Sequence, residues 1–325
     1  MSRRFMKRIL VTGATGQIGS ELVPELRRIH GNENVVVGAH QRPLSEDLKE
    51  SGPFETVDVT DRDSIEKVME QYDIDTIYHM AAILSAAGEK NPLLAWDVNI
   101  NGTLNVLELA RKHDIVRVWH PSSIAVFGPE TPQDNTPQET VLKPRTMYGL
   151  TKVALELLGN FYFERFGLDV RGVRYPGIIS SDTLPVGGTT DYAVEIFYEA
   201  IKQGHYTCFL REDTFLPMMY MPDCIKATID LMNADLSKLR HHTDFNISAM
   251  SFSPNDLAEE IKKHIPEFTI SYDPDSRQAI ADSWPKTIDD SVACEEWGWK
   301  PSYDLAAMTK DMLKKLRIRY ESGQL

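Results

Sequence analysis

The chain has 325 residues, of which 42% are hydrophobic and 26% are charged, and its formal net charge at pH 7 is −13. This length supports one large α/β domain with a smaller lobe, and the composition is that of an ordinary soluble enzyme. The acidic balance, without any basic stripe, argues against a nucleic-acid partner and against binding to an anionic membrane.

The cysteines and the first residues indicate the compartment. Cys208, Cys224 and Cys294 are odd in number and match no metal-ligand or redox spacing, which predicts reduced thiols and no metal site. The basic residues at 2–8 lead directly into a strand pattern, and no hydrophobic run is long enough for a signal or a membrane span. We therefore expect a cytoplasmic protein that acts on small molecules.

The first predicted elements are a strand at 8–12, a glycine turn and a helix that continues to Ile29. Backbone N–H groups at a helix N-terminus can approach a pyrophosphate only where side chains are absent, which predicts a dinucleotide site. The candidate cofactor-binding residues of this turn are Gly13, Gly16, Gln17, Ile18 and Gly19. The glycine spacing resembles that of the extended short-chain dehydrogenase/reductase family.

The second strand, at 34–40, ends where an acidic residue normally binds the adenine ribose 2′-hydroxyl. His40 and Arg42 lie there instead, and Arg42 could accept a 2′-phosphate or extend into solvent. The expected cofactor is NAD, with NADP not excluded.

A third strand is predicted at 55–61, before a helix at 64–72 that Thr60 or Asp61 would cap. By the family resemblance, Asp58 and Val59 lie against the adenine.

The fourth strand, at 76–82, ends in Ala81 and Ala82, which are small enough for a dinucleotide to pass close by. A helix is predicted at 92–113, although Asn99 and the Asn-Gly pair after it are unfavourable within a helix. Either contacts outside the helix compensate or the helix is loosened or kinked. In the resembling family, the counterpart of Asn99 binds near the active-site end of the cofactor.

The fifth strand, at 116–120, delivers Ser122 and Ser123 to its carboxyl end, where ligands bind in open α/β sheets. Tyr148 and Lys152 share one face of a helix, so the ammonium could hold the phenol partly ionised. Each pair has an ordinary alternative, because serines form turns and Tyr-Lys spacings often place one buried ring beside one solvated charge.

Together, Ser-Ser-x-x-Val-Phe-Gly and Tyr-x-x-x-Lys resemble the catalytic signature of the extended short-chain family. Ser123 matches the catalytic serine, with Ser122 as the second candidate. Residues 128–145 contain four prolines and are expected to form a surface loop.

The sixth strand is predicted at 169–178, and its tail, with Tyr175 and Ile178, approaches the nicotinamide in the resembling family. The predicted fold is a Rossmann-type doubly wound parallel α/β sheet with a smaller, discontinuous C-terminal substrate lobe. The dinucleotide-binding domain would comprise residues 1–179 with returning pieces near 223–248, and the lobe residues 180–222 and 249–325.

The lobe begins with a glycine turn and hydroxyl side chains, which could equally be the N-cap of a helix. The motifs at 189–198, 216–223, 283–285 and 289–299 are similar to those of the short-chain type of L-threonine 3-dehydrogenase, with Val186 where relatives tend to have glycine. The resemblance assigns L-threonine contacts to Ser85, Ser122, Ser123, Tyr148, Thr189, Thr190 and Asp191.

The resemblance implies a metal-independent oxidation of the 3-hydroxyl of L-threonine to 2-amino-3-oxobutanoate. Tyr148, with its pKa lowered by Lys152 and by the nearby cationic nicotinamide, would be the base. Ser123 and Ser122 would orient the oxygen, and Lys152 would anchor the nicotinamide ribose. The helices at 92–113 and 147–166 would form a homodimer contact. The alternatives are a sugar-nucleotide epimerase or dehydratase, for which the lobe has few clustered arginines, and a non-catalytic dinucleotide sensor, which would usually lack the Tyr-Lys pair.

Overall fold

The computed structural model describes residues 6–184 and 187–325 of the chain. Two compact units are present. The first consists of Met1–Val126, Thr146–Arg174 and Ile225–Phe245, and the second of Phe127–Arg145, Tyr175–Cys224 and Asn246–Leu325. The segment predicted as a proline-rich loop is therefore part of the second unit.

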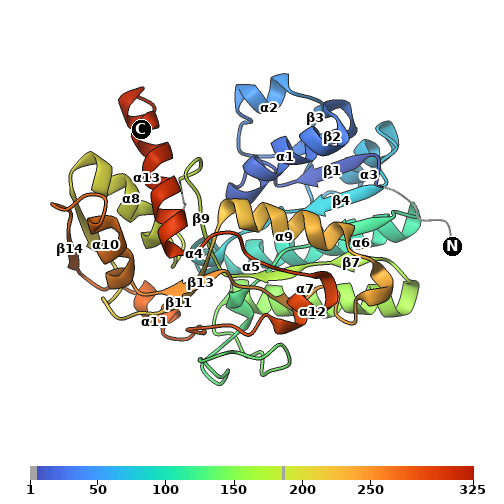
Figure 1. Ribbon diagram of the computed structural model, residues 1–325. Coiled ribbons are helices and arrows are strands. Elements are labelled where there is room, and N and C mark those ends of the chain that lie inside the picture. The colour runs from blue at the N-terminus through green and yellow to red at the C-terminus, as the bar shows by residue number, and fades with distance from the viewer. Residues whose placement is uncertain (1–5, 185–186) are drawn as a thin grey trace. The chain divides into compact units, whose positions relative to one another are not determined.

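The first unit contains a sheet of six parallel strands in the order β3-β2-β1-β4-β5-β7, seen side by side in Figure 1. The strands are β1 (Ile9–Thr12), β2 (Val35–Ala39), β3 (Phe54–Thr56), β4 (Thr76–His79), β5 (Arg117–Trp119) and β7 (Val170–Arg171). The direction of winding reverses between β1 and β4, which is where such sheets bind ligands. The predicted Rossmann-type doubly wound parallel sheet is confirmed.

The strand register produces a hydrophobic core on one face of this sheet. Ile77 pairs with Leu10 on one side and with Val118 on the other, and Val118 pairs with Val170. These side chains are buried against α3 (Arg62–Gln71), α6 (Gly102–Lys112) and α7 (Met147–Phe166). Burial of each such side chain contributes about 1.5–3 kcal/mol.

Helices also cover the opposite face. Successive residues of a strand point to opposite sides of the sheet, so Arg171 points away from that core. Its guanidinium donates to the carbonyl of Leu231, in α9 (Met221–Asn233), at 2.6 Å, and to that of Ala234 at 2.8 Å. α1 (Gln17–His30) contacts β1 and β2, and α2 (Glu46–Glu50) follows β2.

The helical region after β4 contains an unusual turn. α4 (Ser85–Lys90), which the sequence did not predict, is followed by α5 (Pro92–Trp96), a π-helical turn at Asp97–Asn101 and then α6. The predicted helix at 92–113 thus exists, but with a widened turn around Asn99. π turns are rare and often occur at functional sites.

Two predicted strands are shorter than expected. β3 ends at Thr56 rather than at 61, because the Asp58 carboxylate accepts hydrogen bonds from the backbone and hydroxyl of Thr60 and forms a turn. Asp58 and Val59 therefore lie in the turn before α3, where Asp61 is the N-cap.

The predicted strand at 169–178 is divided into β7, β8 (Val173–Tyr175) and β9 (Gly177–Ile179). At Gly172 a Cβ would lie 2.1 Å from the His120 carbonyl oxygen, and Pro176 has no N–H for a ladder hydrogen bond. Both residues interrupt the strand, so the prediction of one continuous element was wrong. Two further short strands are β6 (Ser122–Ser123) and β12 (Phe245–Asn246).

The second unit is built on two small sheets. β11 (Leu216–Tyr220) pairs in parallel with β9 and antiparallel with β13 (Met250–Phe252), and β10 (His205–Cys208) pairs in parallel with β14 (Thr269–Tyr272). Its helices are α8 (Tyr192–Lys202), α10 (Pro254–Lys262), α11 (Arg277–Ala281), α12 (Ser291–Trp297) and α13 (Leu305–Glu321). Across the described ranges, every helix falls short of the length and hydrophobicity needed to cross a membrane.

Candidate active site

α7 presents Tyr148 and Lys152 on one face. The Thr146 hydroxyl caps the helix by accepting from the Gly149 N–H at 3.0 Å, which fixes the first turn. Lys152 Nζ lies 5.4 Å from the centroid of the Tyr148 ring and donates to the Pro121 carbonyl at 2.6 Å. The Lys152 side chain is buried, although such groups rarely are without a paired charge.

Burial shifts the pKa of both groups toward their neutral forms. It raises the pKa of Tyr148 to about 12, against a hydrogen bond with Ser123 that lowers it. Burial lowers the pKa of Lys152 to about 8, and the negative charge of Glu156 acts in the opposite direction. In the chain alone, the pKa of Tyr148 therefore lies above its usual value, because burial outweighs the hydrogen bond with Ser123. The lowering by Lys152 together with a cationic nicotinamide stays a prediction.

The two serines of β6 point to different partners. Ser122 is buried and donates to Glu156 Oε1 at 2.5 Å. Ser123 is half-buried, accepts from the Ala125 N–H at 3.2 Å and hydrogen-bonds Tyr148. Of the two candidates, Ser123 is the serine in contact with the phenol.

The Asn99 side chain, in the π turn, links the segment after β4 to α7. Its Oδ1 accepts from the Ile83 N–H at 2.8 Å, and its Nδ2 donates to the Ile83 carbonyl and to Thr151 Oγ1, both at 3.1 Å. Thr151 in turn donates to the Tyr148 carbonyl at 2.8 Å. These contacts lie outside the helix and compensate for Asn99, which is the first of the two alternatives that the sequence left open. They attach the π turn to α7 between Tyr148 and Lys152.

The glycine turn leaves a cradle at the start of α1. Gly13 has φ +67°, and a Cβ there would lie 2.5 Å from the Ala81 backbone nitrogen. A Cβ at Gly19 would lie 2.7 Å from the Gly13 carbonyl oxygen, and Gly16, the N-cap, has no side chain to cap the helix. Within the described ranges, the buried Gln17 Nε2 has no hydrogen-bond partner. Close backbone approach, open N–H groups and an unpaired donor fit the phosphates of a dinucleotide.

A carboxylate lies near the end of β2, although the sequence has no acid in that strand. Asp58 Oδ2 is 3.6 Å from Nε2 of His40, which follows β2. The pKa of Asp58 is lowered because hydrogen bonds from Thr60 and the charge of His40 together outweigh the effect of burial. Arg42 is exposed. Ile18, Val59 and Ala82 lie in α1, before α3 and after β4 respectively.

Two predicted cofactor residues, Tyr175 and Ile178, belong to the second unit, as does the predicted substrate turn at 189–191. The predicted substrate residue Ser85 belongs to the first unit, where it is the first residue of α4. Tyr175 is buried, with its hydroxyl 3.5 Å from the Cys224 carbonyl, and Ile178 lies in β9.

Asp191 organises the predicted substrate turn. Its carboxylate accepts from the Gly188 N–H at 2.5 Å, and burial raises its pKa. Asp191 stands at the N-cap position of α8, but its side chain makes no cap hydrogen bond. Thr189 is buried, and the Thr190 methyl group packs so closely on Gly177 that a Cβ there would lie 2.7 Å away. The substitution noted at Val186 lies outside the described residues.

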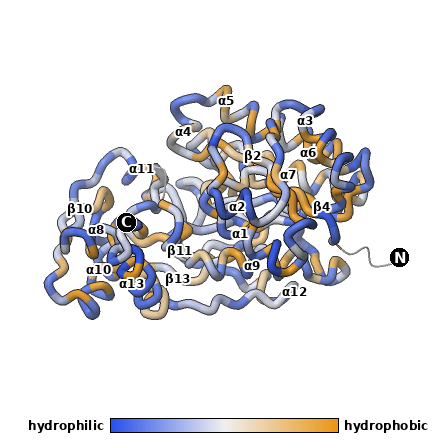
Figure 2. Tube along the Cα trace, turned by 90° about the horizontal axis from the view of Figure 1, so that it is seen from above, coloured by the Kyte–Doolittle hydropathy of each residue, from blue (hydrophilic) through white to orange (hydrophobic). Residues whose placement is uncertain are grey.

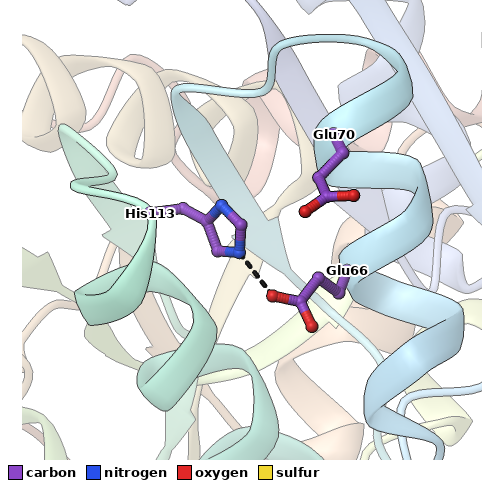
Figure 3. A group of neighbouring side chains, drawn as sticks. All are labelled: Glu66, Glu70 and His113. Atoms are coloured by element: carbon purple, nitrogen blue, oxygen red, sulfur yellow. Dashed lines mark hydrogen bonds and ion pairs between the residues drawn. The ribbon is translucent and has the colours of Figure 1, made fainter.

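A second group of titratable side chains lies between α3 and α6. Figure 3 shows Glu66 and Glu70 on α3 facing His113 at the end of α6. The Glu66 carboxylate accepts from His113 Nε2 at 2.6 Å and from Lys112 Nζ at 2.5 Å, and these bonds lower the pKa of Glu66 to about 2. Because both donors share one carboxylate oxygen, the group is accounted for as an ionic link between two helices.

Glu156 contacts Ser122 and influences Lys152, and it is a site residue that was not predicted from the sequence. Its signal is visible in hindsight, since Tyr148, Lys152 and Glu156 recur every fourth residue. An acid placed in the buried face of a helix is unusual and indicates a partner.

Comparison with known proteins agrees with this geometry. Residues 9–248 match the NAD dependent epimerase/dehydratase family. An uncharacterized epimerase/dehydratase of Staphylococcus haemolyticus is 52% identical over 318 residues, covering 98% of this chain and 100% of that protein.

Two solved structures are similar along nearly the whole chain. L-threonine dehydrogenase from Clostridium difficile superposes with a TM-score of 0.95 at 51% identity, covering 97% of this chain and 99% of that one. A monomeric L-threonine 3-dehydrogenase from a metagenome superposes with a TM-score of 0.91 at 48% identity, covering 95% of this chain and 99% of that one. The chain thus belongs to the NAD dependent epimerase/dehydratase family.

Proposed function

We propose that the protein oxidises the 3-hydroxyl of L-threonine to 2-amino-3-oxobutanoate, with NAD as the hydride acceptor. The observation that carries this proposal is the contact of Ser123 with Tyr148, beside Lys152, at the carboxyl end of the parallel sheet. Similarity over nearly the whole chain to L-threonine dehydrogenases supports the choice of substrate.

In this reaction the bound dinucleotide supplies a hydride acceptor for C3 of the substrate. Tyr148 Oη takes the proton of the 3-hydroxyl, and Ser123 donates a hydrogen bond to the same oxygen. Because burial raises the pKa of Tyr148 to about 12, the phenolate needs positive charge nearby, which Lys152 and an oxidised nicotinamide would provide. Proton transfer by a positioned base accelerates such reactions about 10²- to 10⁴-fold.

The choice of NAD over NADP rests on Asp58. Its carboxylate lies 3.6 Å from His40 at the end of β2, the region in which this fold binds the adenine ribose. A carboxylate there can accept from a 2′-hydroxyl and repels a 2′-phosphate. The free thiols of Cys208, Cys224 and Cys294 support a reducing, cytoplasmic setting.

We also propose a homodimer through α5 and α7. Leu93 is 85% exposed on α5, and Leu157 and Phe161 are 64% and 51% exposed on α7. Figure 2 shows hydrophobic residues along α5, and α5 packs against α7 within the first unit. An exposed hydrophobic face of this kind usually marks a protein contact, and a second copy of the chain is the partner we propose.

A dinucleotide-reduction assay tests the reaction. L-threonine, D-threonine, L-allo-threonine and L-serine are each offered with NAD and with NADP, and UDP-glucose is incubated separately for isomerised product. We expect reduction of NAD with L-threonine and little with the other pairs. Isomerisation of the nucleotide sugar without threonine oxidation would instead establish an epimerase. Tight dinucleotide binding without turnover would indicate a sensor.

A further inference from the structure

Glu156 occupies a position that packing alone does not explain. It follows Tyr148 and Lys152 at four-residue intervals on α7 and is 3% exposed. A buried carboxylate costs desolvation energy, and a buried ion pair generally adds little net stability compared with hydrophobic side chains of the same volume. Its contacts therefore bear on the reacting groups rather than on folding alone.

A buried arginine fixes the orientation of this carboxylate. Arg174 donates from Nε to Glu156 Oε1 and from Nη2 to Oε2, both at 2.9 Å. Two parallel N–H···O bonds hold the carboxylate plane in one direction. Asp244 Oδ2 lies 3.9 Å from Arg174 Nη2, and the Thr243 hydroxyl donates to the Glu156 carbonyl at 2.9 Å.

The same carboxylate determines the direction of the Ser122 proton. Burial raises the pKa of Glu156, and the charge and hydrogen bonds of Arg174 oppose this rise. A carboxylate held ionised by Arg174 only accepts hydrogen bonds, so Ser122 is the donor in its bond to Glu156 Oε1. Ser122 then has no proton to donate to a substrate oxygen. The residues on either side of Ser122 contact the catalytic pair. The Pro121 carbonyl accepts from Lys152, and Ser123 hydrogen-bonds Tyr148.

Glu156 also acts on the charge of Lys152. The titratable groups facing Lys152 are Glu156, Tyr148, His79 and His120. Burial lowers the pKa of His79 to about 3 and that of His120 well below its usual value, and burial keeps the Tyr148 phenol protonated. Among these neighbours, Glu156 supplies the negative charge that favours the ammonium form.

We propose that Glu156 is a positioning residue of this site. Held by Arg174, it fixes the hydroxyl of Ser122 and keeps Lys152 an ammonium while Ser123 and Tyr148 act on the substrate. This role rests on the proposed oxidation of L-threonine. The two serines then have different roles. Ser123 hydrogen-bonds the reacting oxygen, and Ser122, held by Glu156, supports Ser123.

The chain contains a matched control. Asp169 and Arg171 form a second buried pair, in which Nε and Nη2 of the arginine donate to the two carboxylate oxygens at 2.7 and 2.9 Å. Asp169 also accepts from Arg117 Nε, at the amino end of β5, and so lies at the opposite end of the strand from Ser122 and Ser123. Loss of this pair should perturb folding to a similar degree without reaching the site.

The test compares Glu156→Gln, Glu156→Asp and Asp169→Asn in the full-length protein, with kcat and KM for L-threonine measured across pH. We expect Glu156→Gln to lower kcat about 10- to 100-fold, within the range for a misplaced proton-transfer group, and to leave NAD affinity within about threefold. The pH above which kcat falls, here called the alkaline limb, should move about one unit lower in Glu156→Gln. The reason is that the nearby negative charge of Glu156 favours the ammonium form of Lys152 by about one pKa unit.

The conservative variants separate charge from geometry. Glu156→Asp keeps the negative charge, so its alkaline limb should lie at the wild-type pH while its kcat stays reduced. Asp169→Asn should have the kcat and the alkaline limb of the wild type. A purely structural role is established, and the proposal overturned, if Glu156→Gln keeps the wild-type limb and kcat. If Glu156→Gln does not fold, Glu156→Asp alone decides, because it keeps the charge beside Arg174 and changes the position of the carboxylate. A reduced kcat with the wild-type pH dependence supports the proposal there, and a wild-type kcat overturns it.

A measurement without substrate separates this proposal from the proposed function. Urea unfolding across pH reports Lys152, because the unfolded chain binds the proton more tightly and stability rises with pH above about 8. In Glu156→Gln this rise should begin about one unit lower. If the rise begins lower and L-threonine is not oxidised, the proposed function is wrong, whereas the effect of Glu156 on Lys152 is supported. If L-threonine is oxidised and the rise does not move, the positioning role fails.

Discussion

Lys152 carries a charge that the fold disfavours. Its ammonium is buried and has the Pro121 carbonyl as its hydrogen-bond partner, so desolvation lowers its pKa from 10.5 to about 8. Below pH 8 the folded protein must hold this buried ammonium, whereas the unfolded chain hydrates it freely. Function and stability therefore oppose each other at this residue.

Replacing Lys152 by Met should stabilise the protein while abolishing its activity. At pH 7 we expect the free energy of unfolding to rise by about 1–3 kcal/mol, since each unit of pKa shift corresponds to about 1.4 kcal/mol and one hydrogen bond is lost. The gain should shrink between pH 8 and 10.5, where the wild-type lysine loses its proton in the folded state.

Urea denaturation at several pH values measures this difference. Lys67→Met, at an exposed position on α3, serves as the control and should change stability by no more than about 0.5 kcal/mol. A Lys152→Met protein that is less stable than wild type at pH 7 would contradict the assignment of a buried charge.

Tyr148→Phe tests the base directly. Removing the phenol oxygen should lower kcat about 10²- to 10⁴-fold, the contribution of a positioned proton-transfer group. Affinity for NADH, followed by fluorescence titration, should change little, because the glycine cradle remains. Tyr320→Phe, at an exposed position on α13, should behave as wild type. Normal turnover by Tyr148→Phe would remove this residue from the mechanism.

The glycine turn shows how tightly one element is packed against itself. At Gly19 a Cβ would lie 2.7 Å from the Gly13 carbonyl oxygen and 2.8 Å from Ala14 Cα, both backbone atoms that cannot move alone. Gly19→Ala should therefore displace the first turn of α1, lower stability by about 1–3 kcal/mol and weaken NAD binding at least tenfold.

Calorimetric titration with NAD and thermal unfolding measure these two effects. Gly88→Ala provides the comparison, because the nearest atom to a Cβ there is 3.4 Å away, an ordinary contact. That variant should bind NAD as wild type does. Unaltered NAD affinity in Gly19→Ala would place the dinucleotide elsewhere.

Some elements could be predicted from the sequence and others could not, for physical reasons. The helix predicted at 147–166 has the observed bounds of α7, and the order of strand and helix patterns predicted the parallel sheet. The pattern of hydrophobic residues does not show where one backbone segment lies directly against another. The strand at 169–178 therefore failed at Gly172, where the His120 carbonyl lies against the glycine.

Prediction of the site was limited in a similar way. The spacing of Tyr148 and Lys152 placed them on one helix face, as observed, but their pKa values depend on how much water the whole fold excludes. The partner of Ser122 could not be read either, because Glu156 lies 34 positions along the chain. A local pattern shows which residues share a face, whereas long-range contacts decide which atoms meet.

At the scale of the whole molecule, the exposed face of α5 and α7 predicts association. Replacing Leu157 and Phe161 by Glu places two charges in the proposed contact, which should convert a dimer to monomers, as light scattering after gel filtration would show. Ile318→Glu adds a charge at a 58% exposed position on α13 and should leave the mass unchanged. A monomeric wild-type protein would exclude the proposed dimer.

The π turn at Asp97–Asn101 has a consequence for how the length of this chain can vary. A wider turn takes up one residue more than an α-helix needs, so α5 and α6 are rotated relative to each other by about one residue, or roughly 100°. Deleting a single residue here would restore an unbroken helix, and the Asn99 amide and the buried face of α6 could no longer both keep their directions. In this segment the number of residues, as well as their identity, determines whether Asn99 reaches Ile83 and Thr151.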